Sequence, residues 1–265
     1  MRVLIAGGGI GGLTAALCFA RRGDEVEVFE QAPDFDEVGA GLQLSPNAMR
    51  VFRWLGLESA LAAGGFAPDF AEMRMGQSGR QIFQFPLGKG DAAQKRWGAP
   101  YLHIHRADLV AILRAALEQE TGVTLHTNAR VDQYEDQSGA ISLHLESGAK
   151  YSGDLLIGAD GIHSAIRAQM LGKDQPRFTG NIAWRGTAPI EALGQIAPDP
   201  NATIWLGRGK HAVTYRLKGG TLANFVGVVE RSEWQSESWS EEGAKAEALS
   251  DFADWHPIVQ TLIES

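Results

Sequence analysis

Residues 2–23 read RVLIAGGGIGGLTAALCFARRG, a short apolar run followed by glycines and then by a helical pattern. The run at 2–6 is typical of a buried strand in a parallel sheet, and the helical spacing of apolar residues continues from residue 10 to Gly23. Residues 25–30, EVEVFE, alternate as a second strand does. A strand, a glycine loop, a helix and a strand within thirty residues indicate an α/β fold with a Rossmann-like domain.

The glycine loop has the spacing of a dinucleotide-binding turn. Gly7 permits the tight turn, Gly9 lets the backbone approach a pyrophosphate, and Gly12 lets the helix pack on the strand. Glu30 ends the second strand, where a carboxylate accepts hydrogen bonds from an adenosine ribose, and its charge disfavours a 2′-phosphate. The loop therefore predicts NAD or FAD, with a purely structural turn as the alternative. The residues expected to line this site are Gly7, Gly9, Gly11, Gly12, Glu30 and Gln31.

Composition excludes several classes of protein. The chain has 265 residues, 44% of them hydrophobic, so it is long enough to bury a core, and its net charge of −8 argues against a nucleic-acid binder. Cys18 is the single cysteine, which excludes a disulfide framework, and His103 and His105 lack a third metal ligand, so no metal site is expected. Glycines interrupt the apolar N-terminal stretch. We therefore expect no membrane contact and a cytoplasmic protein.

The pattern of residues in the sequence changes after residue 180. Strand patterns joined by glycine turns predict a second, mostly antiparallel layer, and the clearest hairpin turn is Gly219-Gly220. These strands are expected at 181–190, 202–206, 211–217 and 222–230. The expected domains are residues 1–175, residues 176–240 and a helical segment at 241–265 that returns toward the first domain, with the hairpin at 66–100 packed on the second layer.

Three further segments carry a resemblance to a known family. They are GAGLQLSPNA at 39–48, HRADL at 105–109 and GADGIHSAIR at 158–167. Together with the glycine loop they resemble the single-component FAD-dependent aromatic hydroxylases, in the salicylate hydroxylase and 3-hydroxybenzoate 6-hydroxylase branch. The resemblance extends from residue 1 to about residue 263 and implies a p-hydroxybenzoate hydroxylase-like fold. Its D-G-x-x-S-x-x-R motif stands at Asp160, Gly161, Ser164 and Arg167.

The resemblance implies FAD as cofactor and NADH or NADPH as co-substrate. Arg106 would reach the pyrophosphate or ribityl part of FAD, Asp160 would take part in FAD and NAD(P)H contacts, and Gln43 would lie near the flavin ring. For each of these residues, a simpler structural role remains an alternative. Arg106 is alternatively a surface cation before a helix, and Asp160 alternatively caps the helix that Ser164 begins.

The implied reaction is hydroxylation of a phenolic or carboxylated aromatic ring. NAD(P)H reduces the flavin, O₂ adds at its C4a carbon, and the resulting hydroperoxide transfers oxygen to a small aromatic substrate. A base must deprotonate the phenol, and His211 and Tyr215 share one face of a predicted strand. His211 is alternatively a turn residue, and Arg185 either pairs with a substrate carboxylate or faces solvent.

Members of that family carry a Gly-Asp segment after the second layer, and the Gly-Asp pair furthest along this chain is Gly153-Asp154. We therefore expect a fragment that binds FAD weakly. The alternative functions are another FAD oxidoreductase on the same scaffold, such as a quinone-pathway hydroxylase, and a catalytically weak nucleotide-binding fragment. The sequence leaves a monomer and a homodimer open.

Overall fold

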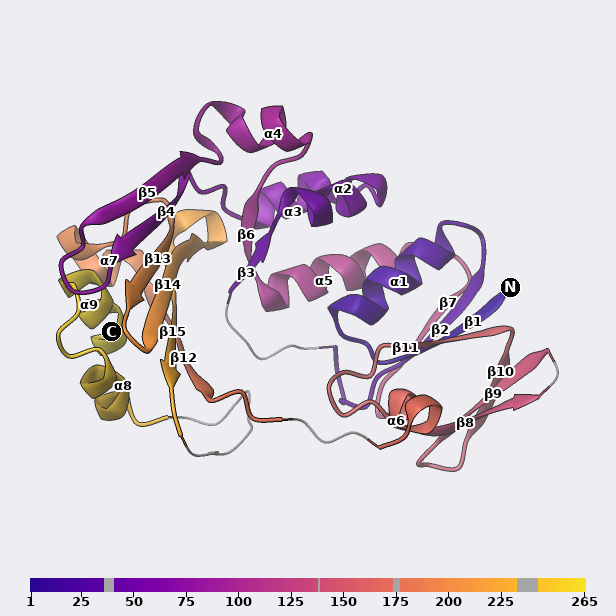
Figure 1. Ribbon diagram of the computed structural model, residues 1–265. Coiled ribbons are helices and arrows are strands. Elements are labelled where there is room, and N and C mark those ends of the chain that lie inside the picture. Colours follow the sequence, from indigo (N-terminus) through magenta and orange to yellow (C-terminus); the bar gives the residue numbers. More distant parts are fainter. Residues whose placement is uncertain (36–40, 138, 174–176, 233–242) are drawn as a thin grey trace. The chain divides into compact units, whose positions relative to one another are not determined.

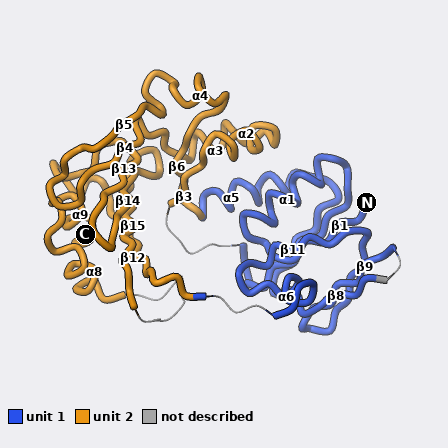
Figure 2. Tube along the Cα trace, in the orientation of Figure 1, with its two compact units in different colours: residues 1–37, 107–177 blue, residues 38–106, 178–265 orange. Residues whose placement is uncertain are grey.

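The computed structural model describes residues 1–35, 41–137, 139–173, 177–232 and 243–265, and the chain forms two compact units (Figures 1 and 2). Unit 1 comprises residues 1–37 and 107–177, and unit 2 comprises residues 38–106 and 178–265. The sequence-based boundary places residues 1–175 in the first domain, with the hairpin at 66–100 packed on the second layer, whereas the contacts group the whole segment 38–106 with unit 2. Within the described residues, no helix is long and apolar enough to cross a membrane.

Unit 1 is built on a four-stranded parallel sheet. Its strand order is β11-β1-β2-β7. The central strand is apolar because both of its faces are covered, and Val3–Ala6 are fully buried. The predicted sequence of strand, glycine loop, helix and strand is confirmed. The elements are β1 (Arg2–Ala6), α1 (Ile10–Ala20), β2 (Glu25–Phe29), α5 (Arg106–Leu117), β7 (Val123–His126), β11 (Leu155–Gly158) and α6 (Ala165–Leu171).

A three-stranded antiparallel sheet completes unit 1. It consists of β8 (Val131–Gln137), β9 (Ala140–Leu145) and β10 (Lys150–Gly153), in the order β10-β9-β8. Leu143 and Ile166 pack with Leu4 and Phe29 in one buried cluster. This cluster joins the small sheet and α6 to the strands that carry the glycine loop.

Unit 2 is built on a six-stranded sheet in the order β12-β15-β14-β13-β4-β5. All its pairs are antiparallel except β13 with β4, and this pair brings residues 70–86 into the same sheet as the later strands. The predicted, mostly antiparallel second layer is confirmed. Its strands are β4 (Phe70–Met75), β5 (Gln81–Pro86), β12 (Asn181–Pro189), β13 (Ala202–Gly207), β14 (Lys210–Leu217) and β15 (Leu222–Glu230).

Shorter elements surround this sheet. A two-stranded ribbon, β3 (Gly41–Leu44) with β6 (Leu102–His105), contacts β14. The α-helices of unit 2 are α2 (Pro46–Trp54), α3 (Glu58–Gly64), α4 (Ala92–Trp97), α7 (Ile190–Leu193), α8 (Lys245–Asp251) and α9 (Pro257–Glu264).

The two faces of the six-stranded sheet differ in character. Trp205, Ala212 and Phe225 point to one side, where they are buried in a cluster with residues from α8 and α9. Side chains at odd positions of β14 and even positions of β15 point the other way, because strand residues alternate between faces. Tyr215 stands opposite Asn224 in the register, and both lie on this second side.

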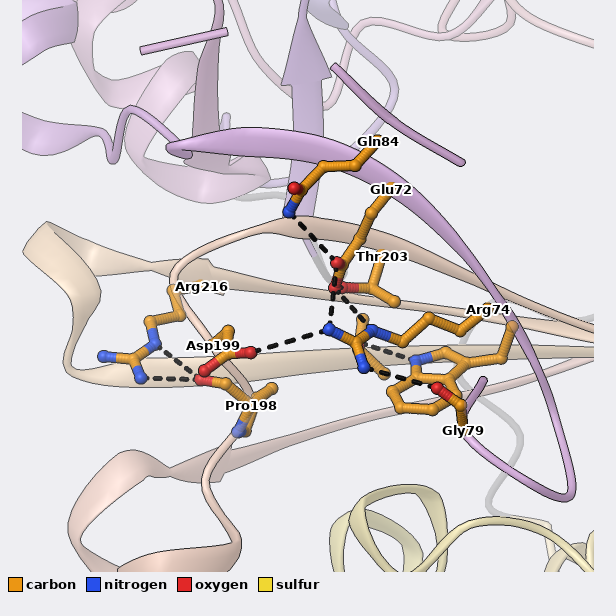
Figure 3. A network of polar contacts seen from close by, with 10 residues as sticks. Glu72, Arg74, Gly79, Gln84, Pro198, Asp199, Thr203 and Arg216 are labelled. Carbon is orange, nitrogen blue, oxygen red and sulfur yellow. Dashed lines mark hydrogen bonds and ion pairs between the residues drawn. The ribbon is translucent and has the colours of Figure 1, made fainter. Parts of the chain in front are cut away.

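A buried carboxylate links β4 to β13 on the helix-covered side (Figure 3). Glu72 is only 3% exposed, and its Oε1 accepts hydrogen bonds from Arg74 Nε at 3.0 Å and Thr203 Oγ1 at 2.7 Å. Burial alone raises the pKa of Glu72, but these hydrogen bonds and the charge of Arg74 outweigh burial and hold the pKa below its usual range. The ionised carboxylate therefore fixes the position of β4 against β13.

We expect Thr203→Val to destabilise the protein, because it removes a donor from a buried charge while keeping the shape of the side chain. A hydrogen bond to a charged group contributes about 1.5–3 kcal/mol. Urea unfolding monitored by tryptophan fluorescence measures the change in the free energy of unfolding. The matched control is Thr221→Val, since its exposed hydroxyl donates to the Lys218 carbonyl, and it should change stability by less than about 0.5 kcal/mol. Equal losses in the two variants would contradict the assignment.

Candidate active site

The loop after β1 needs glycine at two positions for reasons internal to unit 1. Gly7 has a φ of +100°, and a Cβ there would lie 2.3 Å from the Ala159 carbonyl oxygen. A Cβ on Gly12 would lie 1.9 Å from the Gly7 oxygen, so α1 can begin here only without that side chain. Gly11 differs, because nothing lies within 4 Å of its Cβ position. The loop thus leaves open space at the start of α1.

The start of α1 suits an anion. Gly9 stands at the N-cap with extended backbone angles, and the first turn holds no acidic residue. The first N–H groups of a helix lack partners within the helix and carry its partial positive charge. A phosphate or pyrophosphate group would accept hydrogen bonds from them.

Glu30 is held by the main chain on both of its carboxylate oxygens. Gly8 N donates to Oε2 at 2.7 Å, and Ala32 N donates to Oε1 at 2.8 Å. Each oxygen keeps further acceptor capacity for a ligand. The carboxylate is therefore oriented in advance beside the glycine loop, as a ribose-binding residue requires, and Gln31 lies exposed next to it.

The residues of the motif at 160–167 form hydrogen bonds with one another. Asp160 accepts hydrogen bonds from the Ser164 hydroxyl and, at 3.2 Å, from Ile166 N, while Ser164 Oγ accepts from Arg167 N at 2.9 Å. The Arg167 guanidinium donates to the carbonyls of Gly161 and Ile162. Ser164 is thus the N-cap of α6 and Asp160 supports it, and the main-chain nitrogen of Asp160 would be 2.8 Å from a Cβ on Gly7. The structure places this rigid turn directly against the glycine loop.

In unit 2, the aromatic ring of Tyr215 is the centre of a cluster. Its centroid lies 4.5 Å from that of His103, and the Tyr101 ring stands edge-on to His103 at 5.8 Å. The Tyr101 hydroxyl donates to Gln43 Oε1 at 2.9 Å. The ribbon of β3 and β6 therefore brings Gln43 to the same region as Tyr215. Residues 39 and 40, the start of the GAGLQLSPNA segment, lie outside the described residues.

Burial sets the protonation of this cluster. Tyr215 is 4% exposed, and burial raises the pKa of its hydroxyl, an effect that the nearby charge of Arg185 opposes only in part. Burial also lowers the pKa of His103 to about 3, against a smaller opposing effect of the Arg216 carbonyl. At neutral pH, Tyr215 is a protonated phenol that is able to donate a hydrogen bond, and His103 carries no charge.

Two arginines add positive charge to unit 2. Burial lowers the pKa of Arg106 at the start of α5, and the nearby charge of Arg185 on β12 lowers it further. Arg185 stands opposite Val226, on the same side of the sheet as Tyr215. The electrostatic effect of Arg185 on Arg106 shows that the two positive charges act on the same region of unit 2.

His211 lies on the Tyr215 side of β14 but near the other end of the strand. The two residues are four positions apart, which is about 13 Å along a strand. The half-buried His211 stands opposite Val228 and Leu206 in the register. The two side chains would therefore approach a ligand from different points along the strand.

Sequence reasoning missed two buried polar residues of this cluster. His103 was considered only together with His105 as a metal pair, and Asn224 was not considered. Both are fully buried, and Asn224 Oδ1 accepts a hydrogen bond from Gly41 N at 3.0 Å. The signal available for Asn224 was its position within the apolar strand LANFVGVVE, where an amide requires a partner.

Comparison with known proteins supports the same assignment. The family described as FAD binding domain matches residues 1–259. The 6-hydroxynicotinate 3-monooxygenase of Bordetella bronchiseptica is 35% identical over the whole chain, and the 3-hydroxybenzoate 6-hydroxylase of Polaromonas naphthalenivorans is 38% identical over 99% of it. The chain spans 68% and 64% of the lengths of these two relatives.

Solved structures also match the fold of this chain. Klebsiella pneumoniae HpxO complexed with FAD and uric acid matches the whole chain with a TM-score of 0.84 and 28% identity, over 64% of its own length. A salicylate hydroxylase substrate complex matches with a TM-score of 0.78 and 26% identity, over 66% of its length. The resemblance inferred from the glycine loop and the three further segments is confirmed. The chain belongs to the FAD binding domain family, together with monooxygenases and hydroxylases of aromatic compounds.

Proposed function

We propose that the protein takes part in FAD-dependent hydroxylation of a phenolic or carboxylated aromatic ring, with NAD(P)H and O₂ as co-substrates. The observation that carries this proposal is the cluster in unit 2, where the protonated Tyr215 lies near the positive charge of Arg185. Related proteins named for their action on hydroxybenzoate and hydroxynicotinate support this substrate class. A single cysteine, Cys18, supports a reducing, cytoplasmic location.

The residues of unit 1 fit an FAD molecule. Glu30 would accept hydrogen bonds from the ribose, and the start of α1 beside the open space at Gly11 would bind the pyrophosphate. Arg106, the last residue of the segment 38–106 of unit 2, is proposed as a cation for the anionic oxygens of FAD. When bound, FAD supplies the redox chemistry that links NAD(P)H to O₂. The protein's part is to bind, orient and exclude water.

The side chains of unit 2 would then bind and activate the substrate. Tyr215 would donate a hydrogen bond to the phenolic oxygen, and Arg185 would pair with a carboxylate on the ring. His211 would accept the phenolic proton, since imidazole is the side chain best suited to proton transfer near neutral pH. Deprotonation makes the ring a stronger nucleophile, which is what an oxygen transfer to carbon requires.

The direct test uses the purified chain with added FAD. We expect saturable FAD binding and NADH oxidation that 3-hydroxybenzoate or salicylate stimulates. Mass spectrometry should find one atom of ¹⁸O from ¹⁸O₂ in the product. Hydroxylation of a quinone precursor alone would favour the alternative FAD oxidoreductase. A chain that binds FAD but oxidises no NADH with any aromatic compound would contradict the proposal.

Glu30→Gln should weaken FAD binding at least about tenfold, because a hydrogen bond to a charged acceptor contributes about 1.5–3 kcal/mol. Flavin fluorescence quenching during titration of the apoprotein measures the Kd. Glu25→Gln is the matched control, since Glu25 is an exposed carboxylate at the first residue of β2, whereas Glu30 directly follows the last. Equal affinities of the two variants would exclude Glu30 from the FAD site.

Tyr215→Phe should lower kcat/KM for product formation about tenfold to a hundredfold while FAD binding stays unchanged. The reason is that the variant keeps the ring but removes the donor to the phenolic oxygen. Product formed per NADH consumed should fall as well. Tyr151→Phe is the control, because that ring packs against Phe29 in unit 1. If Tyr215→Phe retained the activity of Tyr151→Phe, the substrate contact would be refuted.

A further inference from the structure

The main chain of His103 is held in place by backbone hydrogen bonds. Phe66 N donates to the His103 carbonyl at 2.8 Å, and His103 N donates to the Phe66 carbonyl at 2.7 Å. On its other side, His103 stands opposite Gln43 in the antiparallel pair of β3 and β6. The residue is thus held between two chain segments, and its fully buried ring contacts the ring of Tyr215.

The buried imidazole of His103 has little polar compensation. Within the part of the chain that the structure describes, neither of its ring nitrogens makes a hydrogen bond of normal geometry, and the Arg216 carbonyl near the ring offsets only part of the effect of burial. Burying a polar group in this way costs free energy, and an apolar side chain would avoid that cost. The contacts it does make are aromatic, with Tyr215 at 4.5 Å, Tyr101 at 5.8 Å and Phe66 at 6.4 Å.

Tyr215 is confined from a second direction by the main chain of Gly41. A Cβ on Gly41 would lie 2.5 Å from Tyr215 Cε2, so the absence of a side chain there allows the close approach. Gly41 is held in place because its N–H donates to Asn224 Oδ1, and Asn224 is the residue opposite Tyr215 in the sheet. The Tyr215 ring therefore has the His103 ring and the Gly41 main chain as two fixed neighbours.

We propose that His103 is a positioning residue, which sets the tilt of the Tyr215 ring and thereby aims its hydroxyl at the substrate. This inference rests on the proposed function for its last step, the contact between Tyr215 and a phenolic ligand. The interplanar angle of 45° between the two rings is the geometry that His103 maintains. Removing the imidazole leaves a gap on one side of Tyr215, and the ring gains freedom to reorient.

The test labels the full chain with 3-fluorotyrosine and follows the four tyrosines by ¹⁹F NMR, with each signal assigned by a Tyr→Phe variant. We expect His103→Ala to shift and broaden the Tyr215 signal while the signals of Tyr134 and Tyr151 in unit 1 stay unchanged. His103→Phe, which restores a ring, should return a narrow Tyr215 signal. The control is His126→Ala, since His126 is also stacked on an aromatic ring, Phe29 at 4.7 Å, but in unit 1.

A titration with 3-hydroxybenzoate in the presence of FAD gives the second readout. His103→Ala should raise the Kd about threefold to tenfold, the range expected from one aromatic contact, and His103→Phe should recover most of it. An unchanged Tyr215 signal and Kd in His103→Ala would overturn the positioning role. If the wild-type Tyr215 signal moved with none of the hydroxybenzoates, the substrate contact of the proposed function would fail instead. If His103→Ala loses its fold, His103→Phe against wild type still tests the ring geometry.

Discussion

The alternation of side chains along the strands of the six-stranded sheet determines the organisation of unit 2. Trp205, Ala212 and Phe225 point into the helix-covered core. The alternate residues of the same strands point to the opposite side of the sheet, where Tyr215 and Asn224 stand opposite each other. A shift of one residue in the register would exchange the two sets completely. The ionised Glu72 with Thr203 and Arg74 stabilises the register between β4 and β13, the strand next to β14 in the sheet.

Local signals in the sequence predicted most of the strands and helices. The strand and helix on either side of the glycine loop, and the turn at Gly219-Gly220, depend on periodicity and on glycine conformations within a few residues. The ribbon of β3 and β6 was not predicted as a pair, because its partners are sixty residues apart and each strand has four residues. Gly41 illustrates the limit, since the residue that requires its lack of a side chain is Tyr215, far along the chain.

Two residues of the predicted FAD site have structural contacts as well as a proposed binding role. Asp160 accepts a hydrogen bond from Ile166 N in the first turn of α6, a helix-end role that the sequence presented beside cofactor binding, and Glu30 accepts hydrogen bonds from Gly8 and Ala32. These roles are compatible, because a carboxylate oxygen accepts more than one hydrogen bond. Contacts of this kind fix the carboxylate before a ligand arrives, so less conformational entropy is lost on binding.

The protonation of Tyr215 limits what it can do in the proposed reaction. A phenol whose pKa is raised by burial is a poor base at neutral pH but a good hydrogen-bond donor, so it would stabilise the negative charge that develops on a phenolic oxygen. The proton must then leave by another route. His211 is the histidine on the same side of β14, about 13 Å along the strand, and the proposed reaction assigns it the proton. In that proposal the donor and the base are separate side chains, because a buried phenol that keeps its proton cannot accept another at neutral pH.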